Sequence, residues 1–354
     1  MSNQPSDVEL VRDDLAGAAA RMSGVSSERV FPYGVLAEFL EEFLKMLCRP
    51  SCTLVCAGLT TPEIAIAADK ADSKLCEIIG ESPFTVDLKV VISAVNEECD
   101  VIYVANPNRV SGSCASVKDL AHLAGTVPRG FLIVDETLYD YSGVTGLSLL
   151  EDCPNVIILR SFTVPFGIHS SCAGFGITGK RLITNMNDSV QLRSVSKAMR
   201  QAIVAAIEDG EATVSRHQEI HDEALRLAVA LTHLGVQCRL AAADFLLMRV
   251  ASPKDAGNFL VAGKVPVDNL DGYPGKKNYL RYRISSRESN DRLLEAFDRM
   301  PANYVKMQGF DRRAVSLYRR RATDSTQRAK RRPASLLLSE RLREQNLVNL
   351  GADK

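Results

Sequence analysis

Short apolar runs alternate with helical segments through the first half of the chain. The apolar runs predict strands at 52–56, 100–105, 131–135, 156–160 and 173–177, and the segments between them predict helices at 62–71, 86–97 and 116–124. Strands that are apolar throughout and separated by helices are typical of a mostly parallel sheet covered on both faces. The pattern therefore predicts a three-layer α/β domain.

The rest of the pattern predicts further helices of the large domain and then a second, smaller domain. Apolar residues from Leu36 to Leu47 recur at helical spacing and stop before Pro50, and residues 180–234 have the pattern of two long helices broken near Gly210. Strands are then predicted at 244–250 and 279–285, with helices at 254–262 and 288–299. We therefore expect an N-terminal helix at 1–23, a large domain at 24–240, a small α+β domain at 241–300 and a tail at 301–354.

Composition and charge set the tail apart from the rest of the chain. The 354 residues are 46% hydrophobic, enough for a sizeable core. Residues 301–354 hold 13 basic and 5 acidic side chains; because 43 basic and 43 acidic residues balance overall, the tail carries +8 and the remainder −8. No apolar run approaches the roughly 18 residues of a membrane span, and the first residues lack the pattern of a targeting segment. We expect a cytoplasmic protein without a membrane partner.

The tail is expected to be an interaction element. Two basic clusters within 319–332 resemble a bipartite nuclear-import signal, so nuclear import is an alternative location. Nucleic-acid binding is a weaker alternative, since no aromatic residue lies among these basic residues to stack on bases. Scattered leucines from Leu336 to Leu350 predict a short helix with an apolar face. We expect this helix to dock on another protein surface.

Cysteine and histidine patterns do not indicate a metal site. The nine cysteines are odd in number and none are spaced C-x-x-C, which favours free thiols in a reducing compartment. His217 and His221 lie four residues apart on a predicted helix, but no third ligand accompanies them. No metal is expected.

Several short motifs occur in an order known from one enzyme family. They are GVSSERV (24–30), NPNRVSG (106–112), VDE (134–136), GYPG (272–275), LR (280–281) and NDRLL (290–294). From about residue 8 to 300 the chain thereby resembles the histidinol-phosphate aminotransferase branch of the class I/II aminotransferases, with threonine-phosphate decarboxylase as a near relative. The resemblance implies the three-layer fold predicted above, with a small C-terminal domain.

The segment that holds pyridoxal phosphate in that family departs from the family pattern. Relatives have a hydroxyl residue, a lysine, two further residues and a glycine; here Thr163 and Gly167 match, but Val164 stands at the lysine position. An isopropyl group has no amine with which to bind an aldehyde covalently. His169 is a weak candidate for a replacement base. Apart from this candidate, the resemblance identifies no catalytic residue.

Other positions implied by the resemblance are partly retained. Asp135 matches the acid that pairs with the ring nitrogen, although it could equally cap a loop. Asn108, Arg109 and Tyr139 are the candidates for contacts at or near the ring hydroxyl. Arg281 matches the arginine that binds the substrate carboxylate, and a simple ion pair with a nearby acid is an equal alternative.

The expected phosphate contacts are changed more strongly. Residues 35–38, which read Val-Leu-Ala-Glu, replace a helix-start motif that binds phosphate in relatives, and Cys172 replaces an arginine. We therefore expect no cofactor, with pyridoxal or pyridoxamine phosphate bound at most weakly and non-covalently.

These changes predict an aminotransferase-family homologue that serves as a non-catalytic binding or scaffold subunit. It would form a homodimer, or a heterodimer with an aminotransferase-like relative. The alternative is an enzyme of related or different chemistry acting on an anionic amino or keto acid through Asp135, Arg109, Arg281, Tyr139 and His169.

Overall fold

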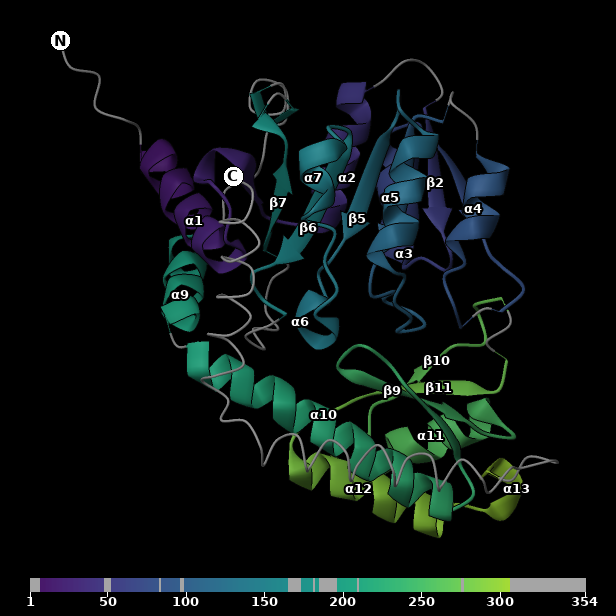
Figure 1. Cartoon of the computed structure of the whole chain (residues 1–354). Coiled ribbons are helices and arrows are strands. Elements are labelled where there is room, and N and C mark those ends of the chain that lie inside the picture. Colours follow the sequence, from purple (N-terminus) through teal and green to yellow (C-terminus); the bar gives the residue numbers. More distant parts are fainter. Residues whose placement is uncertain are drawn as a thin grey trace. The chain divides into compact units, whose positions relative to one another are not determined.

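The chain forms two compact units, Met1–Thr213 and Val214–Lys354. The computed structural model (Figure 1) describes residues 7–47, 52–82, 84–95, 99–164, 173–180, 182–184, 196–208, 210–274 and 277–305. His169, Cys172 and the basic clusters of 319–332 lie outside the described residues. Unit 1 names residues 1–213 below, and unit 2 names residues 214–354.

Within the described residues, unit 1 is built on a seven-stranded sheet of order β1-β7-β6-β5-β4-β2-β3 (Figure 1). Its strands are β1 (Val30–Tyr33), β2 (Thr53–Ala57), β3 (Lys74–Ile78), β4 (Val101–Ala105), β5 (Phe131–Asp135), β6 (Val156–Ser161) and β7 (Gly174–Thr178). β3, β2, β4, β5 and β6 pair in parallel, whereas β7 is antiparallel to both β6 and β1. The predicted mostly parallel sheet is confirmed.

Helices cover both faces of this sheet and complete the three layers. The described helices of unit 1 are α1 (Asp7–Ser23), α2 (Leu36–Leu47), α3 (Pro62–Lys70), α4 (Leu88–Ala94), α5 (Val117–Thr126), α6 (Tyr139–Ser142), α7 (Leu149–Asp152) and α9 (Lys197–Glu208), with a 3-10 turn η1 (Ser27–Arg29). Apolar side chains of α2 and α3 pack on one face, and those of α1, α4, α5, α7 and α9 pack on the other. Burial of these apolar faces is the main force that holds the layers together.

Glycines in β7 allow aromatic side chains of β1 to lie against the sheet. A Cβ atom on Gly176 would lie 1.9 Å from the Phe31 ring, and one on Gly174 would lie 2.4 Å from the Tyr33 ring. Both rings also contact Phe39 of α2, with ring centroids 5.3 and 5.2 Å apart. The glycines therefore make room for the aromatic cluster that fixes the start of α2 beside the sheet.

Unit 2 is a small α+β unit, as the sequence predicted. Its described strands form an antiparallel sheet of order β10-β11-β9-β8, and its helices are α10, which begins in unit 1, and α11, α12 and α13. Their bounds are α10 (Gly210–His233), β8 (Gln237–Leu240), β9 (Phe245–Arg249), α11 (Pro253–Ala262), β10 (Asp268–Asn269), β11 (Tyr279–Arg283), α12 (Arg287–Arg299) and α13 (Ala302–Val305). Among the described helices, none combines the length and the apolar character needed to cross a membrane.

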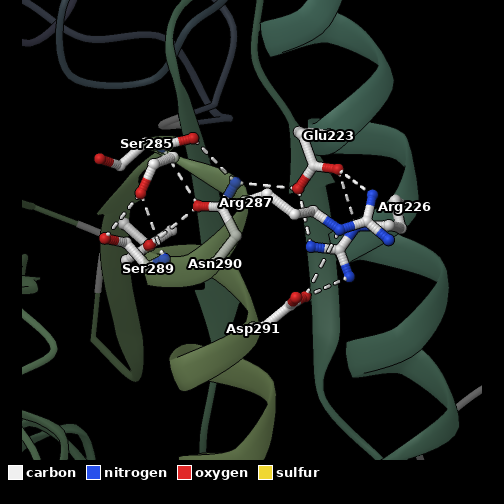
Figure 2. Close-up of polar contacts among 9 residues, drawn as sticks. Glu223, Arg226, Ser285, Arg287, Ser289, Asn290 and Asp291 are labelled. Carbon is white, nitrogen blue, oxygen red and sulfur yellow. Dashed lines mark hydrogen bonds and ion pairs between the residues drawn. The ribbon is translucent and has the colours of Figure 1, made fainter.

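A polar cluster joins α10 to α12 in unit 2 (Figure 2). The Glu223 carboxylate of α10 accepts hydrogen bonds from Arg226 at 2.7 Å, Arg287 at 2.6 Å and Asn290 at 2.9 Å. Burial raises the pKa of Glu223, but hydrogen bonds from Arg226 and Asn290 outweigh it, so that this pKa lies below its usual value. The ionised carboxylate therefore holds the two helices together.

Loss of this carboxylate charge should loosen α12. Because the folded pKa of Glu223 is depressed, its stabilisation is complete above the unfolded pKa of about 4.3 and is lost as the pH falls through the folded pKa. We expect Glu223→Gln to lower the protection of α12 in hydrogen exchange at pH 7 by about 1–2 kcal/mol and to remove the pH dependence below about pH 4.3. Glu288→Gln is the control, since Glu288 is 83% exposed and pairs with Arg292 at the surface. Equal protection in the Glu223→Gln variant and the wild type would contradict this role.

Candidate functional site

The carboxyl ends of three parallel strands meet at one edge of the unit 1 sheet. The register pairs Ala105 of β4 with Asp135 of β5, and Asp135 with Leu159 of β6. The segments that follow these strands contain most of the residues singled out from the sequence. In open α/β sheets, ligands bind beside the carboxyl ends of the strands. This edge of the sheet is therefore the candidate site.

Asp135 is fully buried at this edge, and both of its carboxylate oxygens are engaged. The Tyr103 hydroxyl donates a hydrogen bond to Oδ2, and the backbone N–H of Thr137 donates to Oδ1 at 2.9 Å. Burial, together with the nearby Asp135 charge, holds the pKa of Tyr103 well above its usual value, so the phenol stays protonated and donates. Each carboxylate oxygen has a second lone pair, so Asp135 can still accept a hydrogen bond from a ligand.

Asn108 and its neighbour Asn106 hold the loop after β4. Asn108 donates to the carbonyl of Leu59 at 2.9 Å and accepts from the backbone N–H of Ser111 at 2.9 Å. Asn106 exchanges two hydrogen bonds with the backbone of Ala115, at 2.6 and 3.3 Å. Both side chains are 1% exposed. The structure thus places Asn108 at the candidate site, with its amide group engaged in shaping the loop.

Arg109 follows in the same loop and forms an ion pair with α3. Its guanidinium Nη1 lies 3.1 Å from the Glu63 carboxylate, and the two side chains are 31% and 37% exposed. The positive charge of Arg109 also acts on Tyr103, where it opposes the rise in the pKa of the phenol. Arg109 therefore places a partly exposed cation close to the Tyr103–Asp135 pair.

Tyr139, at the start of α6, packs against a buried ion pair that the sequence did not predict. The Arg160 guanidinium lies 3.9 Å from the centroid of the Tyr139 ring and 3.1 Å from the Glu136 carboxylate. Glu136 also accepts hydrogen bonds from Thr145 at 2.8 Å and from the backbone N–H of Gly146 at 2.6 Å. Burial raises the pKa of Glu136, and the Arg160 charge opposes that rise. The pair therefore links the carboxyl ends of β5 and β6.

Val164 lies in a turn that begins at the end of β6. The Ser161 hydroxyl oxygen accepts hydrogen bonds from the backbone N–H groups of Thr163 and Val164, both at 3.0 Å. The side chain of Val164 is half-buried, whereas Thr163 is buried and its hydroxyl lies 3.1 Å from that of Ser161. The turn holds residue 164 at the carboxyl end of β6, the strand that pairs with β5 at Asp135. His169 comes later in this segment, outside the described residues.

The start of α2 lies at the same edge of the sheet. The register aligns Tyr33, at the end of β1, with Gly174, and Gly174 with Ser161. α2 begins at Leu36, and its first backbone N–H groups lack partners within a helix. Val35, Leu36 and Ala37 carry no side-chain donors, so this helix start offers only backbone donors to an anion.

Arg281 belongs to unit 2, where it forms an ion pair across the small sheet. Its guanidinium lies 2.9 Å from the Asp268 carboxylate on the neighbouring strand β10, and 5.4 Å from the centroid of the Phe245 ring. This is the arrangement of the simpler alternative, an arginine paired with a nearby acid. A role in substrate binding stays a prediction.

Comparison with known proteins identifies the family. Residues 37–297 match the model of the family described as aminotransferase class I and II, a range that covers well over half of the chain. The chain belongs to this family. The resemblance inferred from the short motifs is confirmed, and so is the fold class.

The relatives of this aminotransferase-family protein include several histidinol-phosphate aminotransferases. The enzyme of Nitratidesulfovibrio vulgaris is 28% identical over 298 residues, which cover 80% of this chain and 77% of the relative. The histidinol-phosphate aminotransferase of Dinoroseobacter shibae is 27% identical over 294 residues, covering 80% and 79%.

Solved structures share the fold of this family member. The histidinol-phosphate aminotransferase of Sinorhizobium meliloti, in complex with pyridoxal-5'-phosphate, superposes with a TM-score of 0.72 at 18% identity, over 80% of this chain and 81% of that chain. The L-threonine-O-3-phosphate decarboxylase of Porphyromonas gingivalis has a TM-score of 0.68 at 14% identity, over 81% and 87%.

The expectation that this family member has no cofactor is wrong. The match to the aminotransferase family, the relatives named histidinol-phosphate aminotransferase and the solved structure with pyridoxal-5'-phosphate all point to a pyridoxal phosphate-dependent family. The expectation gave too much weight to the side chains at 35–38, 164 and 172. A missing amine removes one covalent bond, but it leaves the buried carboxylate of Asp135 and the backbone donors at the sheet edge.

Proposed function

We propose that this aminotransferase-family protein binds pyridoxal phosphate at the carboxyl edge of the unit 1 sheet without a covalent bond, and that it acts as a non-catalytic binding subunit. The proposal rests on one observation: the chain has an acid, Asp135, at the position that binds the ring nitrogen in the family, but a valine at residue 164, where the family has its lysine. When bound in relatives, the cofactor supplies an electron sink; this chain would supply its binding site alone.

Asp135 supports binding of the pyridine ring. Its carboxylate is fully buried and is held by the Tyr103 hydroxyl and by the N–H of Thr137 at 2.9 Å. A buried carboxylate fixed by two donors and with lone pairs to spare suits a protonated ring nitrogen, because hydrogen bonds between charged groups are stronger than neutral ones. Asp135 would therefore supply the charged partner that the ring nitrogen of the cofactor needs.

Residue 164 supports the absence of a covalent bond. The turn after β6 holds the Val164 backbone against Ser161, at the position where the family resemblance calls for a lysine. A branched alkyl side chain cannot attack an aldehyde or move a proton on a bound substrate. The amine-dependent steps of transamination would therefore have no group to perform them at this residue.

The phosphate would be held mainly by backbone groups. The start of α2 offers N–H groups at the same edge as Ser161, and the dipole of a helix favours an anion at its start. Arg109, in the loop after β4, is separated from β1 by three strands of the sheet, so its partly exposed cation would lie toward the ring rather than the phosphate.

A partner protein forms the second part of the proposal. The tail at 301–354 carries +8 against −8 for the rest of the chain, and it would contact an acidic surface. That surface would belong to a second copy of this chain or to an aminotransferase-like relative.

The proposal is tested by measuring binding and transamination with the same full-length protein. We expect titration with pyridoxal phosphate to give saturable binding with one ligand per chain, and transfer of an amino group from histidinol phosphate to a 2-oxo acid to stay at background. Absence of saturable binding would overturn the binding site. Turnover well above background would overturn the non-catalytic role.

A further inference from the structure

A buried hydroxyl without a partner lies two residues beyond Asp135. Thr137 is 7% exposed, yet its Oγ1 has no hydrogen-bond partner among the described residues. Other buried threonines of unit 1 contrast with it: the Thr178 hydroxyl donates to the carbonyl of Val156 at 2.7 Å, and the Thr163 hydroxyl lies 3.1 Å from that of Ser161. A buried polar group left unpaired destabilises the folded protein. An unpaired hydroxyl at the carboxyl edge of the unit 1 sheet, where the ligand is proposed to bind, therefore needs an explanation.

The backbone ties Thr137 closely to the ring-binding acid. Its N–H donates to Oδ1 of Asp135 at 2.9 Å, while the Tyr103 hydroxyl takes Oδ2. Any movement of Thr137 would therefore disturb the carboxylate, and the threonine is held in place by the same contact. A fixed hydroxyl beside a fixed carboxylate is preorganised for a ligand, because neither group must be ordered when the ligand binds.

We infer that Thr137 is a ligand-contacting residue, whose hydroxyl hydrogen-bonds a polar group of the phosphorylated pyridine bound at Asp135. This inference rests on the proposed function. It adds a specificity-determining contact to the site, and it explains why the unpaired hydroxyl is tolerated. The ligand-free protein is less stable than it would be with an apolar side chain of the same shape, and the bound ligand gains the hydrogen bond.

The inference predicts opposite effects of one substitution on stability and on binding. Thr137→Val keeps the shape of the side chain and removes the hydroxyl. In the full-length protein freed of ligand, we expect this variant to unfold about 2–4 °C above the wild type, because an unpaired buried hydroxyl has been removed. Its affinity for pyridoxal phosphate should be about three- to tenfold weaker than that of the wild type.

Two further variants separate a ligand contact from a general packing effect. Thr137→Ser keeps the hydroxyl and should retain the wild-type affinity within about threefold. Thr178→Val removes a buried hydroxyl that has a partner, so it should lower the unfolding temperature. Thr178 lies beside the amino end of β6, at the sheet edge opposite the candidate site, so the affinity for pyridoxal phosphate should not change.

The outcomes distinguish this inference from the proposed function. Equal affinity of the wild type and Thr137→Val for pyridoxal phosphate would overturn the inference while the proposed function stands. An unfolding temperature of ligand-free Thr137→Val below that of the wild type would show that the hydroxyl is already paired in the free protein, and would also overturn the inference. If the wild type itself does not bind pyridoxal phosphate, both ideas fail together.

Discussion

Replacing Arg160 by methionine is expected to destabilise unit 1 by about 3–5 kcal/mol, because the Glu136 carboxylate would be left buried without its counter-charge. The two side chains are 8% and 0% exposed, and two guanidinium nitrogens lie within 3.2 Å of one carboxylate oxygen. Methionine keeps the length and the apolar stem of arginine and removes the charge. Urea unfolding followed by circular dichroism would measure the change.

A double variant separates the loss of charge balance from the loss of packing. Combining Arg160→Met with Glu136→Gln removes both charges, so the double variant should recover a large part of the stability lost in the single variant. A single variant within about 1 kcal/mol of the wild type would show that this pair contributes little to the fold.

Replacing Asp135 by asparagine is expected to weaken binding of pyridoxal phosphate about 10- to 100-fold. Asparagine has nearly the same shape and can still accept a hydrogen bond from Tyr103 or Thr137, but it lacks the negative charge that favours a protonated ring nitrogen. A loss of this size corresponds to one hydrogen bond between charged groups, about 1.5–3 kcal/mol. Titration followed by absorbance or calorimetry measures the affinity.

Asp69→Asn is the matched control for this charge change. Asp69 is exposed on α3 of the same unit, so its substitution should leave the affinity unchanged. If Asp135→Asn binds pyridoxal phosphate as tightly as the wild type, Asp135 does not face the ring nitrogen and the proposed position of the ligand is wrong.

The sequence predicted the inner strands of both sheets better than the edge strands. β4, β5 and β6 are continuous apolar runs, because helices cover both of their faces. β3 was missed because it is an edge strand with two of its five residues exposed and none buried, and β1 because it is only four residues long and contains Pro32.

The sequence located the candidate site but could not give the contacts within it. Asp135 could be assigned from the VDE motif, whereas its bond to Tyr103 depends on the register between β4 and β5. A tyrosine two residues before the end of a buried strand was the available signal, since a buried phenol needs a partner. The Glu136–Arg160 pair was missed for the same reason, because its partners are 24 residues apart in sequence.

The error about the cofactor has a different origin. Val164 has no amine and residues 35–38 have no side-chain donors, but the start of α2 still offers backbone N–H groups. Every residue except proline has a backbone N–H group, so substitutions at a helix start that introduce no proline can leave a phosphate-binding edge in place.

Borohydride reduction followed by peptide mass mapping tests the central claim most directly. Wild-type protein and a Val164→Lys variant are each mixed with one equivalent of pyridoxal phosphate, reduced and digested. We predict that no single lysine of the wild type is modified stoichiometrically, although the protein binds the ligand before reduction. The Val164→Lys variant should carry the reduced adduct at residue 164. Stoichiometric modification of one lysine in the wild type, or a Val164→Lys variant that binds the ligand but is unmodified at residue 164, would contradict the account.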